Sequence, residues 1–339
     1  MKKSRFLITL IIVGGWCIFF NCWIIHAAGM PVTVQLQLPA ANKSNGVVNM
    51  DVQPQQKIHF VIWLHNISNK KVSIKVGPGV AKNDNSGQIV LGDNTKQRMD
   101  SSWRYHLRNL GFSPRTVSIP AQKIKKIPVT LQAPNYQGSI SGSIIVQPVV
   151  KLQRHTRFPN QIQQAYGVLL NVGNYEDVKP HLLLGKVYLQ AQGGQVTIVG
   201  EIHNQAPIYY GNGAVSYSAR LQDSHGKKVA SLHLPQAALA ANAIVPLTIA
   251  WGDHPVQAGT YLFKAQVKIG DQLWHFQRHL TISNRQALQL NRQNRNLQPN
   301  RWPLIIFIIC IALIALGLFL WGIFWYAKNQ GSQKIIKKK

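Results

Sequence analysis

The sequence predicts an all-β protein with two tandem immunoglobulin-like β-sandwich domains and a C-terminal transmembrane helix. Two stretches of about 120 residues each contain short segments of alternating apolar and polar residues, separated by turn residues, as in β-sandwiches. Residues 304–326 carry no charge over 23 positions, and as a helix of about 34 Å they are long enough to cross a bilayer. No cysteine lies within 29–303, so hydrophobic cores rather than disulfides must stabilise both domains.

The alternation locates the individual strands. In the first domain we expect strands at 58–64, 72–76, 88–91, 116–119, 127–131 and 139–149. In the second domain we expect strands at 167–172, 182–190, 195–204, 214–222, 228–233, 244–251, 261–269 and 273–283. Residues 102–110 have helical spacing instead, and Gly270-Asp271 is a two-residue hairpin turn.

The two ends of the chain have the features of targeting and anchoring segments. The N-terminus has a basic start, a long apolar run and then small residues, as in a secretory signal peptide, with an uncleaved anchor as the alternative. The lysine-rich C-terminal tail favours a cytoplasmic end. The predicted organisation is a signal peptide at 1–28, a basic β domain at 30–150, a linker at 151–164, a second β domain at 165–283, a polar stalk at 284–303, the transmembrane helix at 304–326 and a cytoplasmic tail at 327–339.

Positive charge is concentrated in the first domain. Residues 30–150 contain fourteen Lys and Arg against four Asp, whereas residues 165–283 contain eight against six acidic residues. A basic surface outside the cell favours anionic partners such as cell-wall polymers, and this location argues against nucleic acid. A generally basic surface without a specific partner is the alternative. The candidate polyanion-binding residues are Lys123, Lys125, Lys126, Lys151, Arg154 and Arg157.

In the segment "QKIKKIPVTL" at 122–131, the residues that a regular strand would turn inward are not all apolar. A regular strand with Ile127 facing inward would also bury two ammonium groups, which is costly without partners. We therefore expect a β-bulge near Lys125-Lys126, and Pro128 should lie in an edge strand because it lacks an N–H. The bulge would bury Ile124, Ile127 and Val129 and expose Lys123, Lys125 and Lys126.

The segment "GSISGSIIV" at 138–146 places two glycines on the face that should enter the core. Ile140, Ile144 and Val146 share that face with Gly138 and Gly142. Glycine there leaves room for another backbone or a large side chain to come close. A simple bulge or twist site and a docking groove for a partner are the two alternatives.

The sequence contains little that indicates catalysis. His-Glu-x-x-His, Gly-x-Ser-x-Gly and phosphate-loop motifs are missing, so we expect no catalytic, cofactor-binding or metal-binding residues and no cofactor. "DNSGQIVLGD" at 84–93 superficially suggests a calcium loop, but it lacks the Glu at position twelve and is expected to be an ordinary loop. A Ser-His-Asp site assembled across strands stays open, and with it a cell-wall hydrolase.

The order of these segments resembles the WxL-interacting proteins of Gram-positive bacteria, in which two β domains precede a membrane helix and a lysine tail. "VTVQLQLP" at 32–39 and "VTLQAPNYQGSISGSIIV" at 129–146 are similar to the family's peptidoglycan-binding domain. "VKPHLLLGKV" at 178–187 and "AGTYLFKAQVKIGDQLWHFQRHLTI" at 258–282 are similar to its host-binding domain.

The resemblance implies a single-pass cell-membrane protein with both β domains outside, acting as an adaptor or adhesin. Its implied partners are surface proteins with Trp-x-Leu (WxL) domains, peptidoglycan or an anionic wall polymer, and host extracellular proteins. The alternative function is an extracytoplasmic chaperone that acts at an open sheet edge, for which 72–76 and 127–131 are the best candidate strands.

Overall fold

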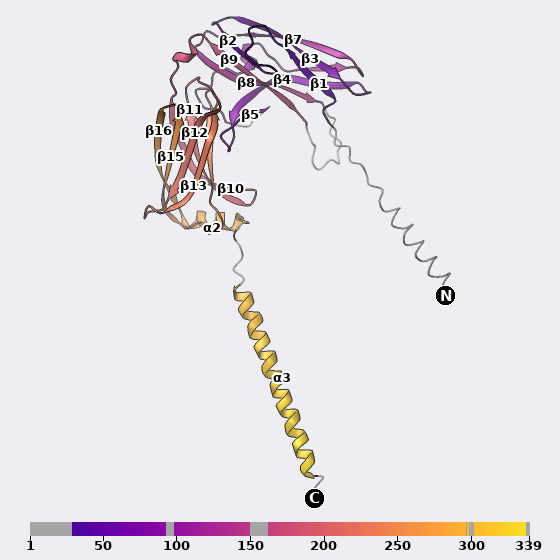
Figure 1. Cartoon of the computed structure of the whole chain (residues 1–339), viewed down its shortest axis with the longest axis vertical. Helices are drawn as coiled ribbons and strands as arrows, with labels where there is room; N and C mark the ends of the chain where they lie inside the picture. The colour runs from indigo at the N-terminus through magenta and orange to yellow at the C-terminus, as the bar shows by residue number, and fades with distance from the viewer. Residues whose placement is uncertain (1–28, 93–97, 150–161, 296, 298–301, 337–339) are drawn as a thin grey trace, which may run out of the picture.

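The computed structural model describes residues 29–92, 98–149, 162–295, 297 and 302–336. Two β domains lie side by side, and a long C-terminal helix extends away from the second (Figure 1). The predicted all-β class with a C-terminal apolar helix is therefore confirmed.

In its described residues the first domain has nine strands in two sheets that share one core. One sheet has the order β1-β3-β7, and the other has the order β2-β9-β8-β4-β5, with β6 paired to β4. The β2–β9 pair is parallel, so the immunoglobulin-like description of this domain stays a prediction. The strands are β1 (Val32–Gln37), β2 (Val48–Val52), β3 (Lys57–Asn66), β4 (Val72–Asn83), β5 (Ile89–Gly92), β6 (Arg115–Ile119), β7 (Ile124–Gln132), β8 (Gly138–Pro148) and β9 (Gln164–Val172).

Strand β9 shows that the predicted domain boundary is wrong. Residues 167–172 were expected to open the second domain, but β9 pairs with β8 and β2, and Val168, Leu170 and Val172 enter the first core. The residues between β8 and β9 therefore join two neighbouring strands of one sheet. The connection between the domains is instead 173–181, which contains the short 3₁₀ helix η2 (Tyr175–Asp177).

The second domain has seven strands in two sheets. The orders are β10-β11-β14 and β13-β12-β15-β16, and side chains from both sheets share a second core. Every strand expected from 182 onward is present, and the Gly270-Asp271 turn joins β15 to β16. The strands are β10 (Leu182–Gln192), β11 (Gln195–Asn204), β12 (Tyr210–Gln222), β13 (Lys228–Leu239), β14 (Ile244–Ala250), β15 (Gly259–Ile269) and β16 (Gln272–Ile282).

Part of the predicted polar stalk is folded onto the second domain. The helix α2 (Asn284–Gln293) buries Ala287 and Leu290 against the second core, and Asn291 exchanges hydrogen bonds with the backbone of Val256 at 2.7 and 2.9 Å. The Ser283 hydroxyl caps this helix by accepting from the N–H of Gln286. The predicted polar stalk at 284–303 is therefore wrong for these residues, which form part of the second domain.

The helix α3 (Trp302–Ile336) contains the predicted transmembrane segment. Within the span Trp302–Ile323 an 18-residue window has a mean hydropathy of 3.1, and none of that window is buried against the rest of the described chain. A fully exposed apolar helix of this length is typical of a membrane anchor. The predicted signal peptide at 1–28 lies outside the described residues and stays a prediction.

The glycines of β8 make room for two large neighbours. A Cβ on Gly142 would lie 2.8 Å from Cγ of Leu107, a buried residue of the 3₁₀ helix η1 (Leu107–Leu110). A Cβ on Gly138, whose φ is +126°, would lie 2.6 Å from the carbonyl oxygen of Pro207 in the second domain. The expected close approach is thus present at both positions, and at Gly138 the neighbour is the chain's own second domain.

Candidate binding surfaces

Three predicted polyanion-binding lysines lie at the start of an edge strand. Strand β7 pairs only with β3. Lys123, just before the strand, and Lys125 and Lys126, at its start, are all exposed. Pro128 lies in this edge strand, as expected of a residue without an N–H. The exposure of the three lysines and the edge position are therefore as predicted.

The expected bulge and the burial of Ile124 are wrong. The β3–β7 register runs without a break from Lys57↔Gln132 to His65↔Ile124, and the Ile124 side chain is 54% exposed. Ile124 shares the outward parity of Lys126. Lys125 faces the same side of the strand as Ile127. It is the first inward-facing residue at the end of an edge strand, where a long side chain can reach water.

Lys126 lies over an aromatic ring. Its Nζ is 3.9 Å from the centroid of the Trp63 ring on β3, and the indole N–H of Trp63 donates to Gln37 on β1 at 3.0 Å. A cation over an aromatic face is stabilised by about 0.5–1 kcal/mol at an exposed site. The contact fixes this ammonium group on the outer face of the sheet.

A buried asparagine brings two more lysines to the same end of the domain. The Asn66 amide donates to the carbonyl oxygens of Lys70, Ile119 and Pro120 at 2.8, 3.1 and 2.8 Å. Its backbone N–H donates to the carbonyl of Lys123 at 3.0 Å. Asn66 thus joins the turn after β3 to the turn before β7. We call the exposed lysines gathered here the basic end: Lys70, Lys71, Lys123, Lys125 and Lys126.

The other three predicted residues lie outside the described residues: Lys151, Arg154 and Arg157. The last described residue before them, Val149, donates its N–H to the carbonyl of Ser73 at 2.8 Å, next to the turn that carries Lys70 and Lys71. Their membership of the basic end stays a prediction. Lys70 and Lys71 were not predicted, although the "SNKK" turn that carries them was visible in the sequence.

The two domains are joined by a second buried asparagine. Asn83, at the end of β4, is fully buried; its amide donates to the carbonyl of Ala238 at 2.8 Å and accepts from the N–H of Ala240 at 2.9 Å. The N–H of Ala238 also donates to the carbonyl of Gly87 at 2.9 Å. The 84–88 loop is closed by Asp84, whose carboxylate accepts from Ser86 and Gln88. This loop is therefore a docking element that binds β13 of the second domain.

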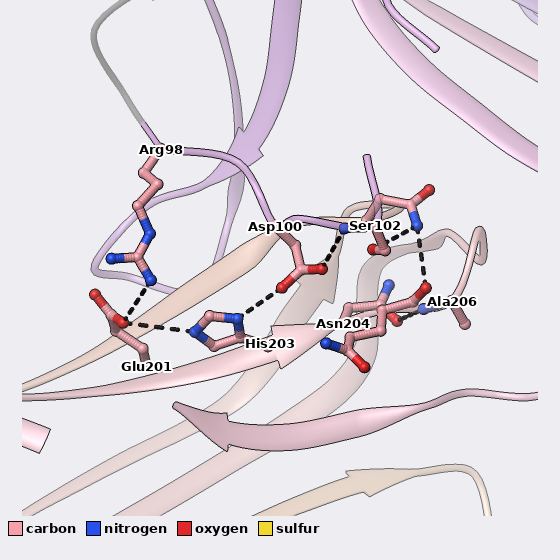
Figure 2. Close-up of polar contacts among 9 residues, drawn as sticks. Arg98, Asp100, Ser102, Glu201, His203, Asn204 and Ala206 are labelled. Atoms are coloured by element: carbon pink, nitrogen blue, oxygen red, sulfur yellow. Dashed lines mark hydrogen bonds and ion pairs between the residues drawn. The ribbon is translucent and has the colours of Figure 1, made fainter. Parts of the chain in front are cut away.

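Charged side chains extend the junction. Figure 2 shows Asp100 reaching His203 on β11, at 2.6 Å between Oδ2 and Nδ1, and Arg98 reaching Glu201 at 3.4 Å. Asp100 is 4% exposed. Burial would raise the pKa of its carboxyl, but hydrogen bonds from Ser102 and from His203 outweigh burial and hold the pKa below its usual value. The junction therefore holds Asp100 as a carboxylate at neutral pH.

Among the described residues, no three His, Cys, Asp or Glu side chains gather in a way that could hold a metal ion. His203 instead contacts Asp100 across the domain boundary and Glu201 on its own strand.

Two family models match the sequence in the predicted order. The peptidoglycan binding domain of WxL Interacting Protein matches residues 32–148, and the host binding domain matches residues 153–292. The chain belongs to the WxL-interacting protein family. Both matched regions are binding domains of a cell-surface protein family, and the second match includes β9, which pairs in the first domain's sheet.

Comparison with individual proteins adds only distant likenesses. No curated protein matches the chain. A chain of the chaperone–tip adhesin complex of CFA/I fimbriae is 10% identical with a TM-score of 0.29, over 73% of this chain and 98% of that chain. A chain of the Acinetobacter baumannii CsuC–CsuE complex of Csu pili is 11% identical with a TM-score of 0.28, over 72% of this chain and 97% of that chain. The E. coli chaperone DraB is 12% identical with a TM-score of 0.27, over 73% of this chain and 98% of that chain. Likeness at this level says nothing of function.

Proposed function

We propose that this WxL-interacting protein is a membrane-anchored adaptor or adhesin that holds WxL-domain surface proteins, contacts the cell wall through its first domain and binds a host ligand through its second. Both β domains lie outside the cell, and the C-terminus is cytoplasmic. The lysines that follow α3 and the signal-like N-terminus support this topology. The binding role requires no catalysis and no cofactor.

The observation that carries the wall contact is the basic end. Five exposed lysines meet where Asn66 joins two turns, and within the part of the chain that the structure describes none of them forms an ion pair. An uncompensated cationic end attracts a polyanion such as a wall polymer. We propose that Lys151, Arg154 and Arg157 extend the same surface.

Charge reversal at the basic end tests the wall contact. The full chain in detergent micelles is pelleted with purified wall sacculi at rising salt. Lys123→Glu, Lys125→Glu and Lys126→Glu together should weaken binding roughly tenfold at low salt, since exposed contacts contribute up to about 1 kcal/mol each. Because salt screens exposed charges beyond about 8–10 Å, the wild-type affinity should also fall steeply with salt.

Three exposed lysines after the first domain provide the matched control. Lys179→Glu, Lys186→Glu and Lys227→Glu change the net charge equally but lie away from the basic end. Equal weakening by both triple variants would mean that net charge alone, and not this surface, attracts the wall. Loss of a C-terminal epitope tag on protease shaving of whole cells would contradict the topology.

The pairing of the candidate strands argues against the chaperone alternative. Residues 72–76 of β4 are paired with β6 on one side, and 74–80 are paired with β8 on the other, so this strand offers no open edge. Strand β7 is an edge, but Pro128 and its lysines make it a poor template for another strand. Binding through side-chain surfaces is therefore the function that the geometry supports best.

A further inference from the structure

The second domain has a hollow on the outer face of one sheet. In the sheet β13-β12-β15-β16, Phe263 and Ala265 of β15 lie in the core, and the side chains that alternate with them face outward. A cavity of about 710 Å³ lies on this outer face. We call it the sheet groove, and its polar lining includes Ser218, Arg220, Lys228, Lys264, Gln266 and His275.

Cations face one another in this groove without a partner. Arg220 on β12 lies directly across from Lys264 on β15 in the antiparallel register. Like charges directly opposite each other in a sheet are destabilising. No acidic residue lines the groove, and among the described residues Arg220, Lys228 and Lys264 form no ion pair. A bound anion would relieve the repulsion.

The nearest acidic turn does not neutralise the groove. Asp223, just after β12, accepts hydrogen bonds from the backbone N–H groups of His225 and Lys227, each at 2.9 Å. Its carboxylate is thus used to close the β12–β13 turn. The small net charge of the second domain therefore conceals a local cationic surface.

Uncharged polar groups lie beside the cations. The Ser218 hydroxyl donates to the Gln266 side chain at 3.3 Å, and the Gln266 amide lies 3.1 Å from Nδ1 of His275. Hydroxyl and amide groups of this kind can exchange hydrogen bonds with sugar hydroxyls. An arginine fork beside them matches the geometry of a carboxylate or sulfate.

We propose that the sheet groove binds an anionic polysaccharide whose sugar rings carry carboxylate or sulfate groups. The groove has the size of a ligand pocket, paired cations for the charged groups, and neutral polar groups for the hydroxyls. This inference rests on the proposed host-binding function of the second domain and names its ligand class.

The test is a titration of the full chain in detergent micelles with heparin, which carries both kinds of group. All five lysines of the basic end are first changed to Gln, so that heparin binding by the second domain contributes a larger share of the signal. In that background Arg220→Gln with Lys264→Gln should weaken heparin binding roughly tenfold or more. Lys179→Gln with Lys186→Gln removes the same charge from two exposed residues that do not line the groove, and should leave binding unchanged.

Folding and ligand class are checked alongside. Removing the two opposed cations should leave the Tm equal or higher, so that lost binding does not reflect lost structure. Neutral dextran should not bind, and inorganic polyphosphate should bind more weakly than heparin. The proposal is overturned if heparin binding survives the Arg220→Gln and Lys264→Gln pair, if the control pair weakens it equally, or if polyphosphate binds more tightly.

The wall assay separates this inference from the proposed function. When Arg220→Gln and Lys264→Gln are made in the wild-type chain, the variant should pellet with wall sacculi as the wild type does, because the basic end is intact. If wall binding holds and heparin binding fails, the groove assignment is wrong while the wall contact stands. If wall binding is lost in the groove variants, the separate roles of the two surfaces are contradicted.

Discussion

His203 of β11 and Asp100 lie 2.6 Å apart, from Nδ1 to Oδ2, across the boundary between the two domains. The second oxygen of Asp100 accepts from the N–H of Ser102 at 2.8 Å (Figure 2). The Ser102 hydroxyl in turn accepts from the amide of Asn242 in the second domain at 2.9 Å. The junction therefore depends on a buried carboxylate whose partners come from both domains.

Asp100→Asn should weaken the junction. The change keeps the shape of the side chain but removes its charge, and hydrogen bonds to charged groups contribute about 1.5–3 kcal/mol each. We expect the free energy of unfolding of residues 29–297 to fall by about 1–3 kcal/mol, measured by urea denaturation. Asp253→Asn is the control: Asp253 is exposed beside His254, and its loss should cost less than about 0.5 kcal/mol. Equal effects would contradict the role of Asp100.

The contribution of Asp100 should also depend on pH. Its pKa is lower in the folded protein than in the unfolded chain, so the stabilisation is complete above the ordinary carboxyl value of about 4 and is lost as the pH falls through the folded value. Asp51 has a lowered pKa as well, so the wild type alone is ambiguous. The difference between wild type and Asp100→Asn should therefore stay constant from pH 5 to 7 and shrink below about pH 4. A difference that grew in acid would contradict this sign.

The space at Gly142 can be tested with a double-mutant cycle. Gly142→Ala places a Cβ 2.8 Å from Cγ of Leu107 and should cost about 1–3 kcal/mol through overpacking. Leu107→Ala removes a buried side chain and should cost about 2–5 kcal/mol. If the two residues share this space, the double variant is less destabilised than the sum. Gly211→Ala, where the nearest atom lies 3.9 Å away, is the control with little expected effect.

Local alternation predicted most of the strands, but β1 and β2 were not among those expected, and alternation did not show which sheet each strand joins. Strand β11 covers 195–204, as expected, because one of its faces is buried throughout and the other is mostly partly exposed, which gives a clear alternation. The strand at 167–172 was also found, yet its partners β8 and β2 lie far away in sequence, and periodicity contains no information on pairing. The helix α2 was missed because only a few of its residues are apolar, although Ser283 ahead of it was a capping signal.

The candidate surfaces were likewise predictable only where their residues are close in sequence. The lysines of β7 were visible as a sequence cluster, whereas Lys70 and Lys71 join them only through the tertiary contacts of Asn66. Arg220 and Lys264 are 44 positions apart and meet only through the β12–β15 register, so a domain-wide charge sum could not find them.

Two isoleucines of β7 should differ sharply despite their proximity. Ile127 is 2% exposed and lies in the core, while Ile124 is 54% exposed on the outer face. Ile127→Ala should therefore cost about 2–5 kcal/mol in the free energy of unfolding. Ile124→Ala should cost less than about 0.5 kcal/mol. Thermal or urea unfolding of the two variants gives the comparison. Similar losses of stability would instead support the predicted burial of Ile124.

Asn66→Ala should weaken wall binding without changing a single charge. The variant leaves the carbonyls of Lys70, Ile119 and Pro120 without their donor, and an unsatisfied buried acceptor costs about 1–3 kcal/mol. The two turns of the basic end should then separate, which hydrogen exchange across 66–72 and 119–123 would detect, and sacculus pelleting at low salt should fall severalfold.

Asn204 supplies the matched control for this prediction. It has the same place in the second domain, after a histidine at the end of β11, and its amide donates to the carbonyls of Ile208 and Ala240 at 3.1 and 2.9 Å. Asn204→Ala should therefore cost a similar free energy of unfolding, about 1–3 kcal/mol, through the same loss of a buried donor. It should leave wall binding intact, because no lysine of the basic end depends on it. If both variants weaken pelleting equally, the effect of Asn66 is one of stability alone; if only Asn66→Ala does, its role is to position the lysines.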